Sequence, residues 1–161
     1  MRAAVPILLL AAACTGAAPA RSQAGPIFRT IRIGFQQPVT LGEPIRADVR
    51  ALLEPAGEHR FRVRKGRFSD AQTITVETRP DGAVRCMEFS YAAGFDYAAS
   101  AADYRQSLGP PRSSTGAPAD PVQVTHWEDA RTVFDLTRRG GQVSSLLCDR
   151  TAPSGDRNAA T

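Results

Sequence analysis

The chain has 161 residues, of which 42% are hydrophobic and 22% are charged, and its formal net charge is +4. This length allows one ordinary domain or two very small domains that share a core. The net positive charge is modest and the basic residues form no concentrated patch, which argues against nucleic acid as a partner.

Residues 1–20 are typical of a signal peptide. Arg2 supplies a short positive region, and the apolar run from Ala3 to Ala13 is too short to span a bilayer. Two cleavage sites compete. Ala18-Pro19-Ala20 would release a soluble protein, whereas Leu10 to Cys14 resembles a bacterial lipobox and would leave Cys14 lipidated. We therefore expect an exported, periplasmic protein that is either soluble or anchored through Cys14.

Residues 21–36 are predicted to form a linker and an N-terminal strand, because Ile27 to Phe35 alternates apolar and polar side chains. A helix is predicted to begin at Gly42-Glu43-Pro44, since proline is tolerated in a first turn and Glu43 suits the positive end of the helix dipole. Pro55 and Gly57 should end it. Four apolar residues share one face of this helix: Ile45, Val49, Leu52 and Leu53.

Three strands are predicted after this helix, and three more after a second helix. The first set is His59–Phe68, Thr73–Thr78 and Ala83–Tyr91, and the second set is Val122–Trp127, Arg131–Thr137 and Gln142–Leu147. Pro80-Asp81-Gly82 predicts a hairpin turn between two of these strands. Ser100 and Asp103 are a candidate capping pair for the second helix, which Gly109-Pro110-Pro111 should end.

An internal repeat organises these elements. Phe68 to Phe89 aligns without a gap on Trp127 to Cys148, with seven identities, and Ala47 to Pro55 aligns on Ala102 to Pro110 with five. The repeat predicts an α+β fold of two tandem repeats, each one short helix plus a three-stranded antiparallel sheet, with an extra N-terminal strand. The expected boundaries are 37–94 for the first repeat, 95–150 for the second, and 151–161 for a flexible tail. The sequence leaves open whether each unit begins with the helix or with the strand before it.

Cys86 and Cys148 remain after either cleavage, and two cysteines in an oxidising compartment predict one disulfide. The two thiols occupy different positions of the aligned segments, so a bridge would link the two copies to each other. The alternative is two buried, unpaired thiols. A metal site is not expected, because no histidine pair accompanies the cysteines.

The segment from Leu41 to Pro55 (LGEPIRADVRALLEP), followed by strands that end in DGAVRCMEF, resembles the helix-plus-sheet repeat of two bacterial groups. They are the small outer-membrane assembly lipoproteins of the SmpA/OmlA family and the secreted β-lactamase inhibitory proteins. Four residues match the pattern, whereas Glu54 stands where glycine is usual; the matches are Gly42, Val49, Leu53 and Pro55. The resemblance implies one concave sheet that binds a partner protein. It carries over no functional residue, since only structural positions match.

Catalytic residues are sparse. His59 and His126 are the two histidines, and His126 with Asp129 and Ser144 would be the candidate triad of a small periplasmic hydrolase. No nucleophile-elbow motif accompanies them. Asp70 and Asp129, which are aligned in the repeat, are expected to accept backbone hydrogen bonds in turns.

The segment from Arg60 to Arg67 carries the clearest binding signal. Alternation would place Arg60, Arg62 and Arg64 on one face of a strand, where they could meet an acidic partner, anionic lipid or lipopolysaccharide. The alternative is an edge strand whose charges prevent aggregation. Trp127 joins these arginines as a candidate for partner binding, because it also differs between the two copies.

The sequence as a whole predicts an exported, non-catalytic binding or envelope-assembly module without a cofactor. Its partner is expected to be a protein of the cell envelope. The alternatives are an enzyme inhibitor that uses the combined sheet surface, and the hydrolase built on His126.

Overall fold

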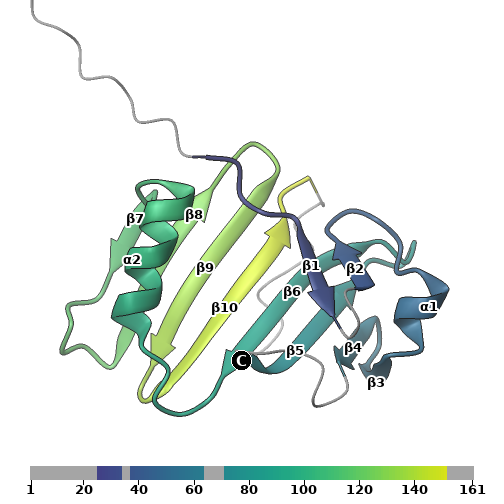
Figure 1. The fold of residues 1–161 in the computed structure, drawn as a ribbon, viewed down its shortest axis with the longest axis horizontal. Helices are drawn as coiled ribbons and strands as arrows, with labels where there is room; N and C mark the ends of the chain where they lie inside the picture. The colour runs from purple at the N-terminus through teal and green to yellow at the C-terminus, as the bar shows by residue number, and fades with distance from the viewer. Residues whose placement is uncertain (1–24, 34–36, 64–70, 152–161) are drawn as a thin grey trace, which may run out of the picture.

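The computed structural model of the chain describes residues 25–33, 37–63 and 71–151 (Figure 1). The predicted signal peptide, Cys14, Arg64 and Asp70 lie outside the described residues. Among the described segments, no helix is long and apolar enough to cross a membrane.

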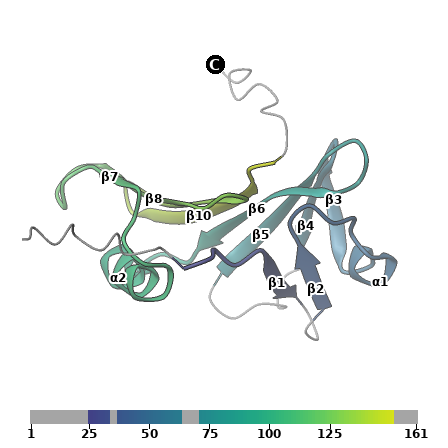
Figure 2. The same ribbon diagram turned by 90° about the horizontal axis from the view of Figure 1, so that it is seen from above.

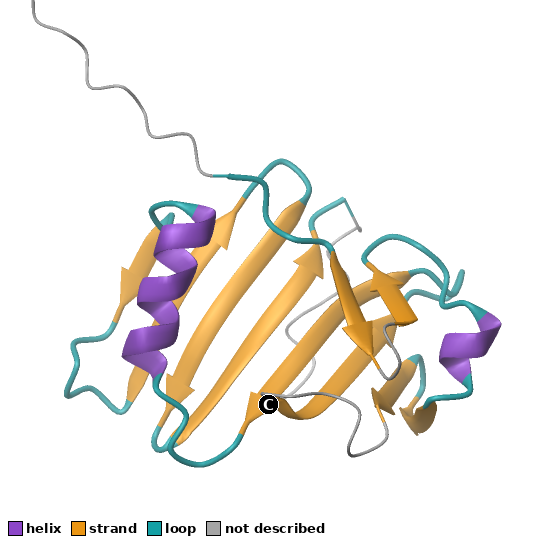
Figure 3. Cartoon of the chain, viewed as in Figure 1, coloured by secondary structure: helices purple, strands orange, loops and turns teal. Residues whose placement is uncertain are grey.

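Strands dominate the described part of the chain, which is 52% strand and 14% helix (Figure 3). The strands are β1 (Thr30–Ile33), β2 (Gln37–Thr40), β3 (Leu53–Gly57), β4 (Arg60–Val63), β5 (Ala71–Thr78), β6 (Val84–Tyr91), β7 (Ser113–Thr115), β8 (Val122–Glu128), β9 (Thr132–Arg139) and β10 (Gln142–Asp149). The helices are α1 (Ala47–Arg50) and α2 (Tyr97–Leu108).

The predicted α+β fold of two tandem repeats, each with its own three-stranded sheet, is wrong. Eight strands form a single antiparallel sheet in the order β3-β4-β5-β6-β10-β9-β8-β7, and β1 pairs with β2 in a separate two-stranded sheet. The aligned segments form the hairpins β5–β6 and β9–β10. The second strands of these hairpins pair with each other, so one continuous sheet results.

The first predicted helix is also wrong in extent. Only Ala47–Arg50 is helical, because Gly42 N–H donates to the Val84 carbonyl (2.8 Å) and Pro44 forms a bridge beside β6. This segment is therefore tied to the sheet and does not begin a helix. Leu53 instead starts β3, where Pro55 is tolerated because β3 is an edge strand with one side free of a ladder.

The second helix begins one turn earlier than predicted and ends where predicted. Asp96 is its N-cap and accepts the Ala99 N–H at 3.0 Å, so the predicted capping pair of Ser100 and Asp103 lies inside the helix. Gly109 follows the last helical residue with a φ of 86°, a conformation that favours glycine.

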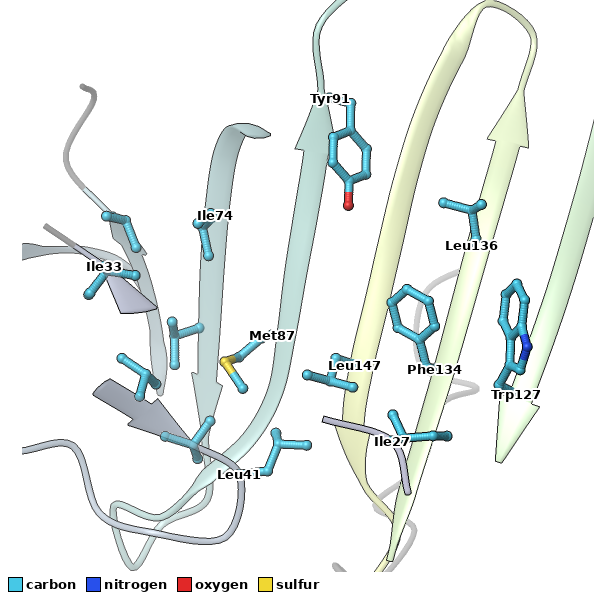
Figure 4. Close-up of a cluster of buried hydrophobic side chains, with 14 of the residues drawn as sticks. Ile27, Ile33, Leu41, Ile74, Met87, Tyr91, Trp127, Phe134, Leu136 and Leu147 are labelled. Carbon is cyan, nitrogen blue, oxygen red and sulfur yellow. The ribbon is translucent and has the colours of Figure 1, made fainter. Parts of the chain in front are cut away.

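α1, α2 and the β1–β2 hairpin all lie on one side of the eight-stranded sheet (Figure 2). Beneath them, side chains from neighbouring strands form the core, and Met87, Leu147, Phe134 and Trp127 succeed one another across the sheet (Figure 4). Tyr104 of α2 packs edge-on against Phe134, with ring centroids 4.7 Å apart. Burial of this apolar surface holds α2 and the β1–β2 hairpin against the sheet.

The central pair of strands is β6 and β10, and a disulfide joins them. Cys86 and Cys148 stand directly opposite each other in the register, with Cα atoms 4.2 Å apart. This pairing of β6 with β10 is called the seam. Farther along it, the hydroxyl groups of Tyr91 and Ser145 form a buried hydrogen bond of 2.8 Å. The predicted disulfide is confirmed, and it indicates an oxidising, exported compartment.

Replacement of both cysteines by serine should lower the free energy of unfolding by about 2–4 kcal/mol, because the bridge restricts the unfolded chain. The two residues are 62 positions apart, so the closed loop is long. Urea denaturation measures the change. A reductant should destabilise the wild type by a similar amount and leave the double variant unaltered. Equal stability of the wild type and the double variant would contradict this account.

Candidate functional site: the open face of the sheet

The face of the sheet turned away from α1, α2 and the β1–β2 hairpin is here called the open face. Alternate residues of β4, β5, β6, β10, β9 and β8 form it, and the strand register arranges them in three rows. The rows are Arg60, Glu77, Cys86, Cys148, Val133 and Glu128; then Arg62, Thr75, Glu88, Leu146, Asp135 and His126; then Ser90, Ser144, Thr137 and Val124. The cysteines are buried, the arginines are exposed, and the other members are half-buried.

Most charges on the open face are paired within the molecule. Arg60 lies 3.5 Å from Glu88, and Arg85 lies 3.3 Å from Glu77. At the other end of the face, Glu128 forms ion pairs with Arg150 at 3.3 Å and with Arg112 at 3.5 Å. These are exposed or half-exposed pairs, so each contributes little to stability. Their effect is to leave the face with both signs of charge and no strong single-sign patch.

His126 lies at the β8 end of the middle row, between two carboxylates. Its Nδ1 donates to Asp135 Oδ1 at 2.5 Å, and its Nε2 lies 3.7 Å from Glu128 Oε2. A carboxylate only accepts, so this hydrogen bond fixes the proton on Nδ1. Asp135 was not a candidate residue in the sequence. The signal that could have found it is the β8–β9 register, which sets Asp135 opposite His126.

The structure does not assemble the predicted hydrolase triad. Asp129 accepts the N–H groups of Ile27, Arg131 and Thr132, so both of its oxygens serve the backbone. Ser144 lies in the third row, opposite Thr137, and no hydrogen bond joins it to His126 in the described part of the chain. The expectation that Asp129 serves a turn is confirmed. His59 is exposed at the β3–β4 turn, beside Glu58.

The predicted binding residues separate in the structure. Arg60 and Arg62 share the open face, and the alternating Phe61 and Val63 point to the covered side, as the sequence predicts. β4 is not the edge of the sheet, because β3 pairs with its outer side. The alternative of an aggregation-preventing edge strand therefore does not apply to β4.

Trp127 is only 2% exposed; its Nε1 donates to the Gly109 carbonyl at 3.0 Å, and its ring packs in the core. Trp127 therefore holds the end of α2 and does not reach the surface.

A buried carboxylate at the end of β10 binds the N-terminal segment on the covered side of the sheet. Asp149, 6% exposed, accepts hydrogen bonds from Arg29 Nη2 at 3.2 Å and from the Thr151 hydroxyl at 2.9 Å. Burial raises the pKa of Asp149, but the hydrogen bonds from Thr151 and Arg29 outweigh it, so the pKa lies below the ordinary value. Arg29 also donates to the Leu41 carbonyl at 3.0 Å. Asp149 thus ties the N-terminal segment to the end of β10.

Comparisons with known proteins do not place the chain in a family. No protein-family model, no curated protein and no solved structure matches it. The resemblance to the SmpA/OmlA lipoproteins and the β-lactamase inhibitory proteins therefore has no support beyond the residues that suggested it.

The variant Asp149→Asn should lower the free energy of unfolding at neutral pH by about 3 kcal/mol, because it leaves the partly buried Arg29 without its charge partner. A carboxyl group with a lowered folded-state pKa contributes stability above its unfolded pKa, about 3.9, and loses it as the pH falls through the folded value. The difference between wild type and variant should therefore shrink below about pH 4.

Urea denaturation from neutral to acid pH measures this dependence. The matched control is Asp103→Asn, which removes one carboxylate from the exposed surface of α2. The control should follow the wild type at every pH. A difference between wild type and Asp149→Asn that stays constant down to acid pH would show that charge at Asp149 is not the cause.

Proposed function

We propose that the protein is an exported, non-catalytic binding module that docks a protein of the cell envelope on its open face. One observation carries the proposal. The described elements cover only one side of the sheet, and the opposite side presents small and apolar side chains near its centre, with mostly paired charges around them. Protein interfaces share this composition, with a core depleted of charge and a polar rim.

The size of the open face suits a protein partner. The six strands that form the open face lie about 4.8 Å apart and together span about 24 Å. Eight-residue strands such as β6 and β10 are about 26 Å long. The resulting area approaches the roughly 800 Å² that each partner contributes to a standard interface. The disulfide at the centre of the face limits rearrangement of the seam, which reduces the entropy lost on binding.

A protein partner is proposed ahead of anionic lipid or lipopolysaccharide. Glu77, Glu88 and Asp135 point in the same direction as Arg60 and Arg62, so a uniformly negative surface would meet carboxylates as well as arginines. A partner with alternating charges fits this face better. The module would work in the periplasm, either soluble or held at a membrane through Cys14. An inhibitor of an exported enzyme remains the second form of the same proposal, because it would use the same face.

The variant Leu146→Arg tests the proposal at the centre of the face. Leu146 is half-buried on β10 between Glu88 and Asp135, so an arginine there can be accommodated in the fold but would block a complementary surface. Wild-type protein immobilised and exposed to envelope extract should retain a discrete partner, and Leu146→Arg should weaken the retention at least about ten-fold. The matched control Ala102→Arg adds the same charge on exposed α2 and should bind as the wild type does.

The nature of the retained protein distinguishes the two forms. Recovery of outer-membrane assembly machinery supports an assembly module, whereas recovery of an enzyme whose activity falls on mixing supports an inhibitor. Equal retention by Leu146→Arg and wild type, with both variants folded by circular dichroism, would contradict binding through the open face.

A further inference from the structure

A cavity of about 490 Å³ lies on the covered side of the sheet, away from the open face. It is bounded by the first turns of α2, by strands β8 and β9, and by the loop between β7 and β8. α2 lies over this end of the sheet, next to the edge strand β7 (Figure 1). A volume of this size is within the range of small-molecule sites.

Arg138 gives the cavity its chemistry. It occupies β9 on the same face as Phe134 and Leu136, and its Nη2 donates to the carbonyls of Pro118 (2.7 Å) and Asp120 (3.1 Å). Its Nε is buried and has no hydrogen-bond partner within the described part of the chain. A buried donor without an acceptor is costly, and a guanidinium N–H is matched best by a carboxylate. No carboxylate of the described residues pairs with Arg138, so this guanidinium brings an uncompensated positive charge to the wall of the cavity.

Arg105 adds a second positive charge to the same cavity. It extends from α2, is exposed, and makes no ion pair with a described residue. Asp96 is the carboxylate that also lines the cavity, and its Oδ1 is engaged in capping the Ala99 N–H. Two guanidinium groups thus face a single carboxylate, so the cavity favours an anionic ligand.

The walls of the cavity are fixed before any ligand arrives. The loop between β7 and β8 is folded on itself, because Asp120 accepts the Ala117 N–H at 2.6 Å and Gln123 donates to the Ala117 carbonyl at 2.7 Å. A hydrogen bond of 2.8 Å between the hydroxyl groups of Tyr97 and Thr125 ties α2 to β8. A site that is already formed loses little entropy when it binds.

We propose that this cavity binds a small organic carboxylate with an apolar or aromatic body. The carboxylate would lie against the guanidinium groups of Arg138 and Arg105, which both line the cavity. The body would lie against the apolar part of the lining, which includes Phe95, Ala98, Ala101 and Pro118. This site lies on the opposite side of the sheet from the open face, so it is independent of the proposed partner.

An NMR titration of the full exported protein with phenylacetate tests the proposal. Saturable shifts are expected for amides of Tyr97 to Ala101 and Ser114 to Gly116, which border the cavity. 2-Phenylethanol, which lacks the charge, and inorganic phosphate, which lacks the apolar body, should each bind at least about ten-fold more weakly. Arg105→Gln should weaken phenylacetate about five-fold. Arg138→Lys, which keeps the charge but removes the planar guanidinium, should weaken it at least about ten-fold.

The matched control is Arg139→Gln, which removes one positive charge from the next residue of β9, on the other face of the sheet. It should bind phenylacetate within about two-fold of the wild type. Three results would overturn the proposal: no saturable shift at about 5 mM phenylacetate, equal binding of 2-phenylethanol, or equal weakening by Arg139→Gln and Arg105→Gln. Because Arg105→Gln alters an exposed side chain, its effect is readable even if Arg138→Lys disturbs the loop.

Discussion

The pairing of β6 with β10 is the interaction on which the rest of the structure depends. Each of these strands ends a hairpin, and their antiparallel ladder converts two four-stranded halves into one eight-stranded sheet. Backbone hydrogen bonds, the Cys86–Cys148 bridge and the buried contact between Tyr91 and Ser145 all cross this seam. Without it, each half would expose a long strand edge and an incomplete core.

A sheet joined in this way has two faces with different roles. The covered side receives α1, α2 and the β1–β2 hairpin, and Asp149 with Arg29 anchors the N-terminal segment there by a partly buried ion pair. The open face keeps half-exposed polar and apolar side chains in regular rows, which is the geometry of a binding platform. At the far end of the covered side, α2 and the β7–β8 loop enclose the cavity that contains Arg138. The two proposed sites therefore lie on opposite faces and do not compete for residues.

Sequence periodicity predicts the six inner strands well, because apolar side chains that point to the core alternate along each strand with side chains that point to the more exposed face. It misses the two edge strands β3 and β7, and it also misses the short strand β2. All three residues of β7 (Ser113–Thr115) are exposed, and β3 contains Pro55, so neither strand carries an apolar pattern. The first helix is over-extended because Val49 and Leu53 share a helical face, whereas backbone bonds to β6 hold the preceding residues. The sheet order, the His126–Asp135 contact and the cavity all depend on pairing between strands, which one sequence does not specify.

Hydrogen exchange measured residue by residue tests the central claim most directly. Amides in the β6–β10 ladder should be the slowest to exchange. They should open only with global unfolding, at the free energy that denaturation gives, together with the core amides of β5 and β9. The edge strands β3 and β7 and the short α1 should open at lower free energy. If the seam amides exchanged faster than the hairpin amides, or if β3–β6 and β7–β10 opened at separate free energies, the two halves would be independent units and the account would be contradicted.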